Sequence, residues 1–251
     1  MAVKKLYNIS EIRKLTSDIF SFQLDAGEIA EQARPGQFVH IKCGEGLLLR
    51  RPISICDAGG GLLRIVFQVR GTGTQWLAER KVGEALDVLG PLGTGFQLPE
   101  SGKVLLAGGG IGTAPLLFAA KSAPEGAVAA LGFRTRTGSI LVEDFRQAGV
   151  AVEVATEDGT LGVPGTVDQV IRRCLQEGTY SAVLACGPTP MLRAISRVTA
   201  GEGTPCQVSL EERMACGIGA CLTCSCKVNG HYRRVCKDGP VFPSEEVEWD
   251  E

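Results

Sequence analysis

Residues 216–224 read Cys216-Gly-Ile-Gly-Ala-Cys221-Leu-Thr-Cys224, and a fourth cysteine, Cys236, follows after eleven residues. The spacing C-x4-C-x2-C-x11-C is typical of plant-type [2Fe–2S] ligation, in which one loop supplies three thiolates and a later residue supplies the fourth. Gly217 and Gly219 allow such a loop to wrap closely, so that backbone amides point at the sulfurs. The pattern therefore predicts a centre that moves electrons one at a time.

A zinc site made of four cysteines is the alternative for the same residues. Such sites usually combine two Cys-x-x-Cys pairs, whereas this stretch contains one, Cys221 and Cys224. Cys226 is a competing ligand, because alternate residues of a strand that starts at Cys224 point to the same face. The x4/x2 spacing is complete without Cys226, which we expect to be a small buried residue. The predicted ligands are Cys216, Cys221, Cys224 and Cys236.

Composition excludes several classes of protein. The 251 residues carry a formal charge of −2, which gives no electrostatic argument for binding nucleic acid. The ten cysteines are not spaced like a disulfide framework, and the first residues lack the apolar stretch of a signal peptide. We therefore expect reduced thiols and a cytoplasmic location. The uncharged run 104–120 contains several glycines and Pro115, so it predicts a strand, a loop and a helix rather than a membrane span.

Hydrophobic periodicity divides the chain into three predicted domains. Residues 1–99 contain short alternating segments at 19–24, 37–42 and 62–69, separated by turns such as Gly90-Pro91, which predict an antiparallel β-barrel. Residues 100–204 alternate between strands and helices and predict a parallel α/β sheet with helices on both faces. Residues 205–251 form a small Cys-rich unit. Helices are expected at 74–79, up to Lys121, and at 138–148, 166–176 and 189–199.

Two stretches of the predicted barrel are suited to phosphate. In Arg51-Pro52-Ile53-Ser54, the guanidinium offers a bidentate fork, the proline stiffens the backbone and the serine offers a hydroxyl. Gly71-Thr72-Gly73-Thr74 ends a strand and opens a helix, where free amides attract anions. The alternative for these stretches is an ordinary strand edge at the surface that binds no ligand. Two phosphate-seeking stretches in one barrel predict a dinucleotide with a pyrophosphate.

Two further stretches lie at the ends of predicted parallel strands. The turn Gly108 to Pro115 joins a buried strand to a helix, with Gly109, Gly110, Gly112 and Thr113 as candidate nucleotide contacts. It departs from G-x-G-x-x-G because Thr113 takes the place of the last glycine, so a tight turn without a ligand is the alternative. Cys186-Gly187-Pro188 follows the last predicted parallel strand, where ligands bind in open α/β sheets. Cys186 could also be a small buried residue.

Together these motifs resemble the ferredoxin–NADP reductase-like flavoprotein family over essentially the whole chain. By that resemblance, Arg51 to Ser54 and Gly71 to Thr74 hold the flavin and its pyrophosphate, and Phe67-Gln68 runs beside the flavin. Gly109 to Pro115 is similar to the family's Gly-Gly-x-Gly-x-x-Pro loop, and Cys186-Gly-Pro188 with Met191 to its Cys-Gly-Pro-x-x-Met motif. The segment Thr156 to Gly162 resembles the loop near the nicotinamide.

The segments Leu210 to Cys221 and Val235 to Phe242 resemble the electron-transfer subunits of class 1B dihydroorotate dehydrogenases. This resemblance implies FAD, a [2Fe–2S] cluster, NAD as acceptor and an FMN-bearing catalytic subunit as partner, in a heterotetramer with two of each subunit. It also implies an oxidoreductase role in pyrimidine biosynthesis, with electrons passing from FMN through the cluster and FAD to NAD⁺.

A chain with flavin, cluster and nicotinamide sites converts between one- and two-electron carriers, and hydride transfer needs no acid or base from the protein. We therefore predict no catalytic residue, and we expect His40 and His231 to be structural. No stretch indicates a dihydroorotate site, which places the substrate on the partner. Arg134 and Arg136 follow the second parallel strand, where a 2′-phosphate could bind, so NADP stays open, although the resemblance favours NAD.

Two other functions fit the same motifs. One is a flavin and iron–sulfur subunit of an NADPH–ferredoxin transhydrogenase or a sulfhydrogenase. The other is a zinc-stabilised nucleotide-binding protein without a redox role.

Overall fold

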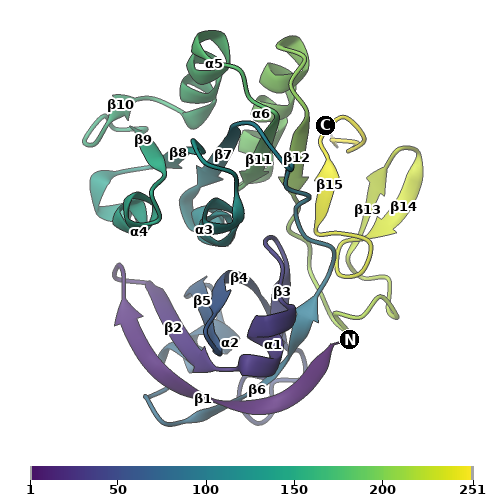
Figure 1. Cartoon of the computed structure of the whole chain (residues 1–251). Coiled ribbons are helices and arrows are strands. Elements are labelled where there is room, and N and C mark those ends of the chain that lie inside the picture. The colour runs from purple at the N-terminus through teal and green to yellow at the C-terminus, as the bar shows by residue number, and fades with distance from the viewer. Residues whose placement is uncertain (1, 250–251) are drawn as a thin grey trace.

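The computed structural model describes residues 2–249, which form a barrel, a sheet with helices on both faces and a small C-terminal hairpin (Figure 1). The barrel closes in the order β1-β2-β5-β4-β3-β6, and all of its strand pairs are antiparallel. Its strands are β1 Val3–Lys14, β2 Ile19–Asp25, β3 Phe38–Ile41, β4 Arg51–Gly59, β5 Leu62–Gln68 and β6 Ala85–Leu92, with short helices α1 Gly27–Gln32 and α2 Thr72–Ala78.

Strand alternation in β3 determines which side chains point away from the barrel core. Val39 and Ile41 lie in the barrel core, whereas Phe38 packs in a different core that includes Phe242 of the C-terminal segment. Side chains two residues apart share a face, so His40 lies on the same outer face as Phe38. Strand pairing places Ser54 opposite Phe38 and Pro52 opposite His40. One outer patch of the barrel therefore combines β3 with part of Arg51-Pro52-Ile53-Ser54.

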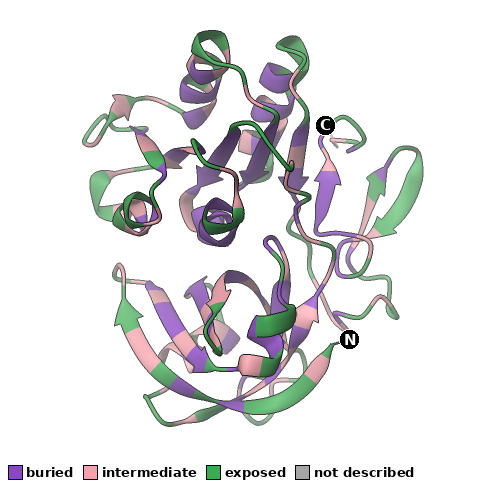
Figure 2. Cartoon of the chain, in the orientation of Figure 1, coloured by how far each residue is buried: buried purple, intermediate pink, exposed green. Residues whose placement is uncertain are grey.

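The second lobe is a seven-stranded sheet in the order β10-β9-β8-β7-β11-β12-β15, parallel except for the pairing of β15 with β12. Its central strands are buried from end to end, as Figure 2 shows. The strands are β7 Val104–Gly109, β8 Val128–Phe133, β9 Ala151–Thr156, β10 Val163–Pro164, β11 Ala182–Cys186, β12 Cys206–Ser209 and β15 Val241–Pro243.

Helices cover both faces of this sheet. α3 Thr113–Ser122 and α4 Val142–Gln147 pack into one core, and α5 Val167–Glu177 and α6 Thr189–Gly201 pack into the other. β7 pairs with β8 on one side and with β11 on the other, so the strand order reverses between β7 and β11. The loops that follow these two strands diverge there and leave a crevice, which is where open α/β sheets bind ligands.

The C-terminal segment returns to both lobes. Its hairpin, β13 Ser225–Val228 and β14 His231–Arg234, stands beside the sheet, and the loop that carries the cysteines lies between the hairpin and the barrel (Figure 1). Thr94, just beyond the barrel, forms a bridge with Pro240, and the Thr94 amide donates to the Gly239 carbonyl at 2.5 Å. These contacts fix the cysteine loop relative to the barrel.

The predicted fold class is confirmed: an antiparallel barrel, a parallel α/β sheet and a cysteine-bearing segment. The division at residues 99 and 204 stays a prediction, and two strands beyond residue 204, β12 and β15, belong to the sheet. Among residues 2–249, no helix is both long and apolar enough to cross a membrane.

Two local predictions are wrong. Gly90-Pro91 is not a turn but lies inside β6, where a register shift opposite β3 accommodates a proline that has no amide to donate. The helix predicted over 138–148 is shorter. A 3-10 turn, η2 Arg136–Gly138, comes first, and α4 begins only at Val142 because Leu141 has a left-handed φ of 61°.

Candidate functional site

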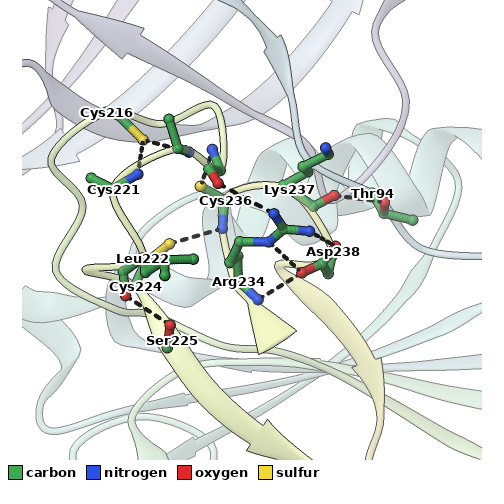
Figure 3. Close-up of polar contacts among 12 residues, drawn as sticks. Thr94, Cys216, Cys221, Leu222, Cys224, Ser225, Arg234, Cys236, Lys237 and Asp238 are labelled. Atoms are coloured by element: carbon green, nitrogen blue, oxygen red, sulfur yellow. Dashed lines mark hydrogen bonds and ion pairs between the residues drawn. The ribbon is translucent and has the colours of Figure 1, made fainter. Parts of the chain in front are cut away.

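The cysteine loop turns its amides toward its sulfurs (Figure 3). Cys216 Sγ accepts hydrogen bonds from the amides of Ile218 at 3.5 Å, Ala220 at 3.3 Å and Cys221 at 3.4 Å. The amide of Gly219, with φ of 82°, donates to Cys236 Sγ at 3.1 Å. Amide donors of this kind stabilise negative charge on sulfur, which fits thiolates that bind iron.

The four cysteines are arranged as two pairs. Cys221 N donates to Cys216 Sγ, and Cys236 N donates to Cys224 Sγ at 3.4 Å. A two-iron cluster with four cysteines needs two thiolates per iron, whereas zinc needs four ligands around one point. The pairing therefore fits the cluster better than it fits zinc.

The thiol acidities differ within the loop. The Thr223 hydroxyl and neighbouring amides lower the pKa of Cys221 to about 6. The amides of Ile218, Cys221 and Ala220 lower the pKa of Cys216 in spite of its burial. Burial, followed by the proximity of Cys224, raises the pKa of Cys236 to about 12. Since thiolates are the metal ligands, these hydrogen bonds favour the ligand form of Cys216 and Cys221.

Arg234 supports the loop from the hairpin. Its guanidinium bonds Asp238 through Nε at 2.9 Å and Nη2 at 3.0 Å, and Nη1 donates to the Gly219 carbonyl at 3.3 Å. Cys226 lies on β13 opposite Arg233, half-buried, and burial raises its pKa to about 11. At Cys226, burial therefore outweighs hydrogen bonding of the kind that favours a thiolate at Cys221.

The structure brings Arg51 and Gly73 together on the barrel. A Cβ added at Gly73 would overlap Arg51 Nε and lie 2.7 Å from its Cζ, so the guanidinium rests on the first turn of α2. Thr74 Oγ1 accepts from the amides of Arg70 at 2.8 Å and Gly71 at 3.2 Å, which closes that turn. A cation over a helix start with free amides is suited to a phosphate.

Gly73→Ala is expected to weaken FAD binding at least tenfold with little change in fold stability. The new methyl would displace the flexible end of Arg51, which costs little in the fold but removes the cation from the phosphate position. Equilibrium dialysis of FAD and thermal unfolding measure the two quantities. Gly59→Ala is the matched control, because Gly59 lies at the end of β4 outside both flavin motifs and no atom lies within 4 Å of its added Cβ. Equal FAD affinity in both variants would refute the assignment of Arg51.

The other predicted flavin residues differ in their accessibility. Ile53 faces the barrel core, while Pro52 and Ser54 lie on the outer face with His40 and Phe38. Phe67 is 2% exposed and packs edge-on against Phe22 in the core, so only its backbone is available to a ligand. Gln68 Nε2 donates to Asp18 Oδ2 at 2.6 Å.

The glycine loop after β7 and the segment after β11 meet at the strand-order reversal. A Cβ at Gly112 would lie 2.5 Å from the Cys186 carbonyl oxygen and 2.6 Å from the Gly187 nitrogen. A Cβ at Gly109 would overlap Met191 Sδ and lie 3.2 Å from Pro188 Cδ. Gly110 has a φ of 54° and open space beside it. The two predicted nucleotide motifs therefore form one surface with room for a close ligand.

Two buried groups lie at this surface. Burial raises the pKa of Cys186 to about 12, so its sulfur is a neutral thiol. Thr113 is fully buried, and its hydroxyl has no hydrogen-bond partner among the described residues. Arg134 is exposed beyond β8, whereas Arg136 Nε donates to the Thr160 carbonyl at 3.0 Å.

Sequence reasoning missed two residues beside these sites. Glu211 follows β12 near Cys186, and desolvation raises its pKa although Arg70 partly offsets the effect. His40 contacts the cysteine loop, since a Cβ at Gly217 would lie 2.9 Å from His40 Cε1. Alternation in Phe38-Val39-His40-Ile41 indicates that His40 shares a face with Phe38, but nothing in the sequence places the cysteine loop on that face.

Comparison with known proteins agrees with this geometry. Residues 211–248 match the family model described as the iron–sulfur cluster binding domain of dihydroorotate dehydrogenase B. A solved structure of an NADH-dependent reduced ferredoxin–NADP oxidoreductase superposes with a TM-score of 0.90 at 34% identity, covering 99% of this chain and 92% of that chain. The ferredoxin reductase of carbazole 1,9a-dioxygenase superposes with a TM-score of 0.69 at 27% identity, covering 81% and 67%.

Curated relatives match over nearly their whole length. The protein named dihydroorotate dehydrogenase B (NAD(+)), electron transfer subunit, from Caldanaerobacter subterraneus subsp. tengcongensis is 42% identical, with 94% of each chain covered. The protein of the same name from Desulforamulus reducens is also 42% identical, with 92% of this chain and 93% of the relative covered. The chain belongs to the family of dihydroorotate dehydrogenase B (NAD⁺) electron transfer subunits.

Proposed function

We propose that this chain passes electrons from the FMN of a dihydroorotate dehydrogenase catalytic subunit, through a [2Fe–2S] cluster and FAD, to NAD⁺. The observation that carries the proposal is the position of the cysteine loop. Gly217 packs on His40, whose strand partner is Pro52 of the flavin motif, so the predicted cluster and flavin sites lie on one face of the barrel. Family membership supports the same electron-transfer role.

The residues fit the groups that this function requires. Cys216, Cys221, Cys224 and Cys236 would hold the cluster, and Arg51, Pro52, Ile53, Ser54, Gly73 and Thr74, with the backbone of Phe67 and Gln68, would hold FAD. Gly109, Gly110, Gly112, Thr113, Cys186, Gly187 and Pro188 would bind the dinucleotide at the strand-order reversal. When bound, flavin supplies exchange between one- and two-electron chemistry, which neither of the other two groups can supply.

The chain's own contribution is to position these groups. Arg51 and the start of α2 neutralise phosphate charge, and the amides around Cys216 and Cys236 offset the charge on sulfur. Buried Cys186 and half-buried Met191, which lies beside Gly109, would form walls of the dinucleotide site. No side chain needs to transfer a proton, which agrees with the neutral thiol at Cys186.

The partner is proposed to meet the exposed tip of the cysteine loop. Ile218 is 56% exposed and Leu222 is 61% exposed, and Cys221 lies between them at the surface. Electron transfer requires short distances, so a foreign redox centre must approach this tip. We propose two copies of each subunit in the assembly and a cytoplasmic location.

The test is oxidation of dihydroorotate by the reconstituted complex. The chain, loaded with FAD and cluster and mixed with the FMN-bearing subunit, should form orotate and NADH in equal amounts, and faster with NAD⁺ than with NADP⁺. If no FMN-bearing partner supports orotate formation with this chain, the proposal is refuted. Rapid reduction of NADP⁺ by ferredoxin instead would support a transhydrogenase subunit, the second candidate, which the 34% identity to the ferredoxin–NADP oxidoreductase structure favours.

A further inference from the structure

His40 occupies the contact between the barrel and the cysteine-bearing segment. The residue is 0% exposed, although histidine is a polar side chain on a strand whose barrel-core positions belong to Val39 and Ile41. Its neighbour on the same face, Phe38, packs in one core with Cys224 and Cys236. His40 is therefore buried outside the barrel, between the barrel and the cysteine loop.

His40 adjoins one residue of each predicted cofactor site. A Cβ at Gly217 would overlap His40 Nδ1, so the ring fills the space that a side chain at residue 217 would need. Gly217 has a φ of 70°, and it precedes Ile218 in the turn that surrounds Cys216 Sγ. On the neighbouring strand β4, Pro52 of the flavin motif lies directly opposite His40. Directly opposed residues have Cβ atoms about 5 Å apart.

Neither ring nitrogen of His40 makes a hydrogen bond of good geometry among residues 2–249, but the Cys216 backbone lies close enough to act on the ring as an acceptor. A neutral imidazole offers one donor and one acceptor. An unsatisfied buried polar atom costs about 1–3 kcal/mol. If His40 only filled space, an apolar ring at this position would give a more stable fold. A nitrogen at this place can instead bond the backbone of the cysteine loop at Cys216.

We propose that His40 is a positioning residue that couples the two redox sites, because its ring holds the cysteine loop at Cys216 and Gly217 against the strand that lies beside Pro52 of the flavin motif. The inference rests on the proposed function and deepens it. Arg50 holds the backbone at His40 in place. Its Nη1 donates to the His40 carbonyl at 3.1 Å, and its Nη2 bonds both carboxylate oxygens of Asp87 at 2.8 Å.

Two variants separate the nitrogen atoms from the ring volume. His40→Phe keeps a planar ring and removes both nitrogens, whereas His40→Gln keeps one donor and one acceptor. The chain loaded with FAD and cluster is reduced with NADH in a stopped-flow instrument, and the cluster is titrated by electron paramagnetic resonance. His231→Phe, on the exposed hairpin strand β14, is the matched control.

The His40→Phe chain should reduce its flavin at the wild-type rate, but electrons should reach the cluster about tenfold more slowly. Loss of one hydrogen bond near the cluster should also shift its one-electron equilibrium about tenfold, which corresponds to about 59 mV. His40→Gln should restore the wild-type rate and potential. If His40→Phe releases the cluster while His40→Gln retains it at the wild-type potential, that result supports the same role.

Equal behaviour of the two His40 variants would overturn the proposal, whether both match the wild type or both fail alike. A wild-type chain that bound neither FAD nor cluster would instead overturn the proposed function. The two failures are therefore distinguishable in the same experiment.

Discussion

Cys221→Ser is expected to remove the cluster and leave FAD bound. Cys221 is the exposed member of the Cys216–Cys221 pair, and the Thr223 hydroxyl and nearby amides lower its pKa to about 6, so it is prepared to bind iron as a thiolate. A serine hydroxyl is not deprotonated near neutral pH and is a poor ligand for iron. The proposed flavin contacts at Arg51 and Gly73 lie on the barrel, away from the substituted residue, and should be unaffected. Iron content should fall by tenfold or more, and flavin content should stay at the wild-type value.

Cys226→Ser is the control for this variant, because Cys226 lies two residues beyond Cys224 and is half-buried on β13. It should keep the iron content and the visible spectrum of the wild type. Loss of the cluster in Cys226→Ser, or a normal cluster spectrum in Cys221→Ser, would mean that a different set of four thiols binds the iron. Iron analysis and visible absorption of both purified variants decide between these outcomes.

Gly112→Ala is expected to abolish productive binding of the nicotinamide dinucleotide. Its Cβ would lie 2.5 Å from the Cys186 carbonyl oxygen and 2.6 Å from the Gly187 nitrogen, and backbone atoms of two adjoining strand ends cannot move aside as a side chain can. Overpacking of this kind costs about 1–3 kcal/mol and forces the two motifs apart. The KM for NADH should rise at least tenfold in a flavin-reductase assay, while FAD and iron contents stay normal.

Gly201→Ala is the matched control in the same lobe. Gly201 lies at the end of α6 with no atom within 4 Å of an added Cβ, and alanine favours a helix more than glycine does. Its KM for NADH should equal that of the wild type. Unchanged KM values in the Gly112→Ala chain would show that the loop after β7 does not bind the dinucleotide.

The sequence predicted elements whose residues carry a local signal. The strands at β2, β5, β7 and β11 are short apolar runs between turns, and the cysteine spacing identifies its own loop. β1 was missed because most of its positions are exposed and it contains several lysines, so alternation is weak. β15 is only three residues long and ends in Pro243, and its place in the sheet depends on pairing with β12.

The candidate sites likewise combine residues that carry a local sequence signal with residues that carry none. Gly73 and Gly112 occur in recognisable motifs, but the reasons for glycine, the guanidinium of Arg51 and the carbonyl of Cys186, come from distant segments that meet only in the fold. No local sequence pattern marked His40 as part of a site, because its contact with Gly217 joins residues far apart in the chain. Contacts of this kind are set by tertiary packing and cannot be read from local periodicity.

Anaerobic titration of the purified chain with NADH tests the central claim most directly, that one polypeptide links a two-electron nicotinamide to a one-electron cluster. Visible absorption follows the flavin, and electron paramagnetic resonance follows the cluster. The chain should accept about three electrons, two at the flavin and one at the cluster, with the cluster signal appearing after NADH is added. A colourless protein that contains zinc, or a flavin that is reduced while no cluster signal appears, would contradict the account.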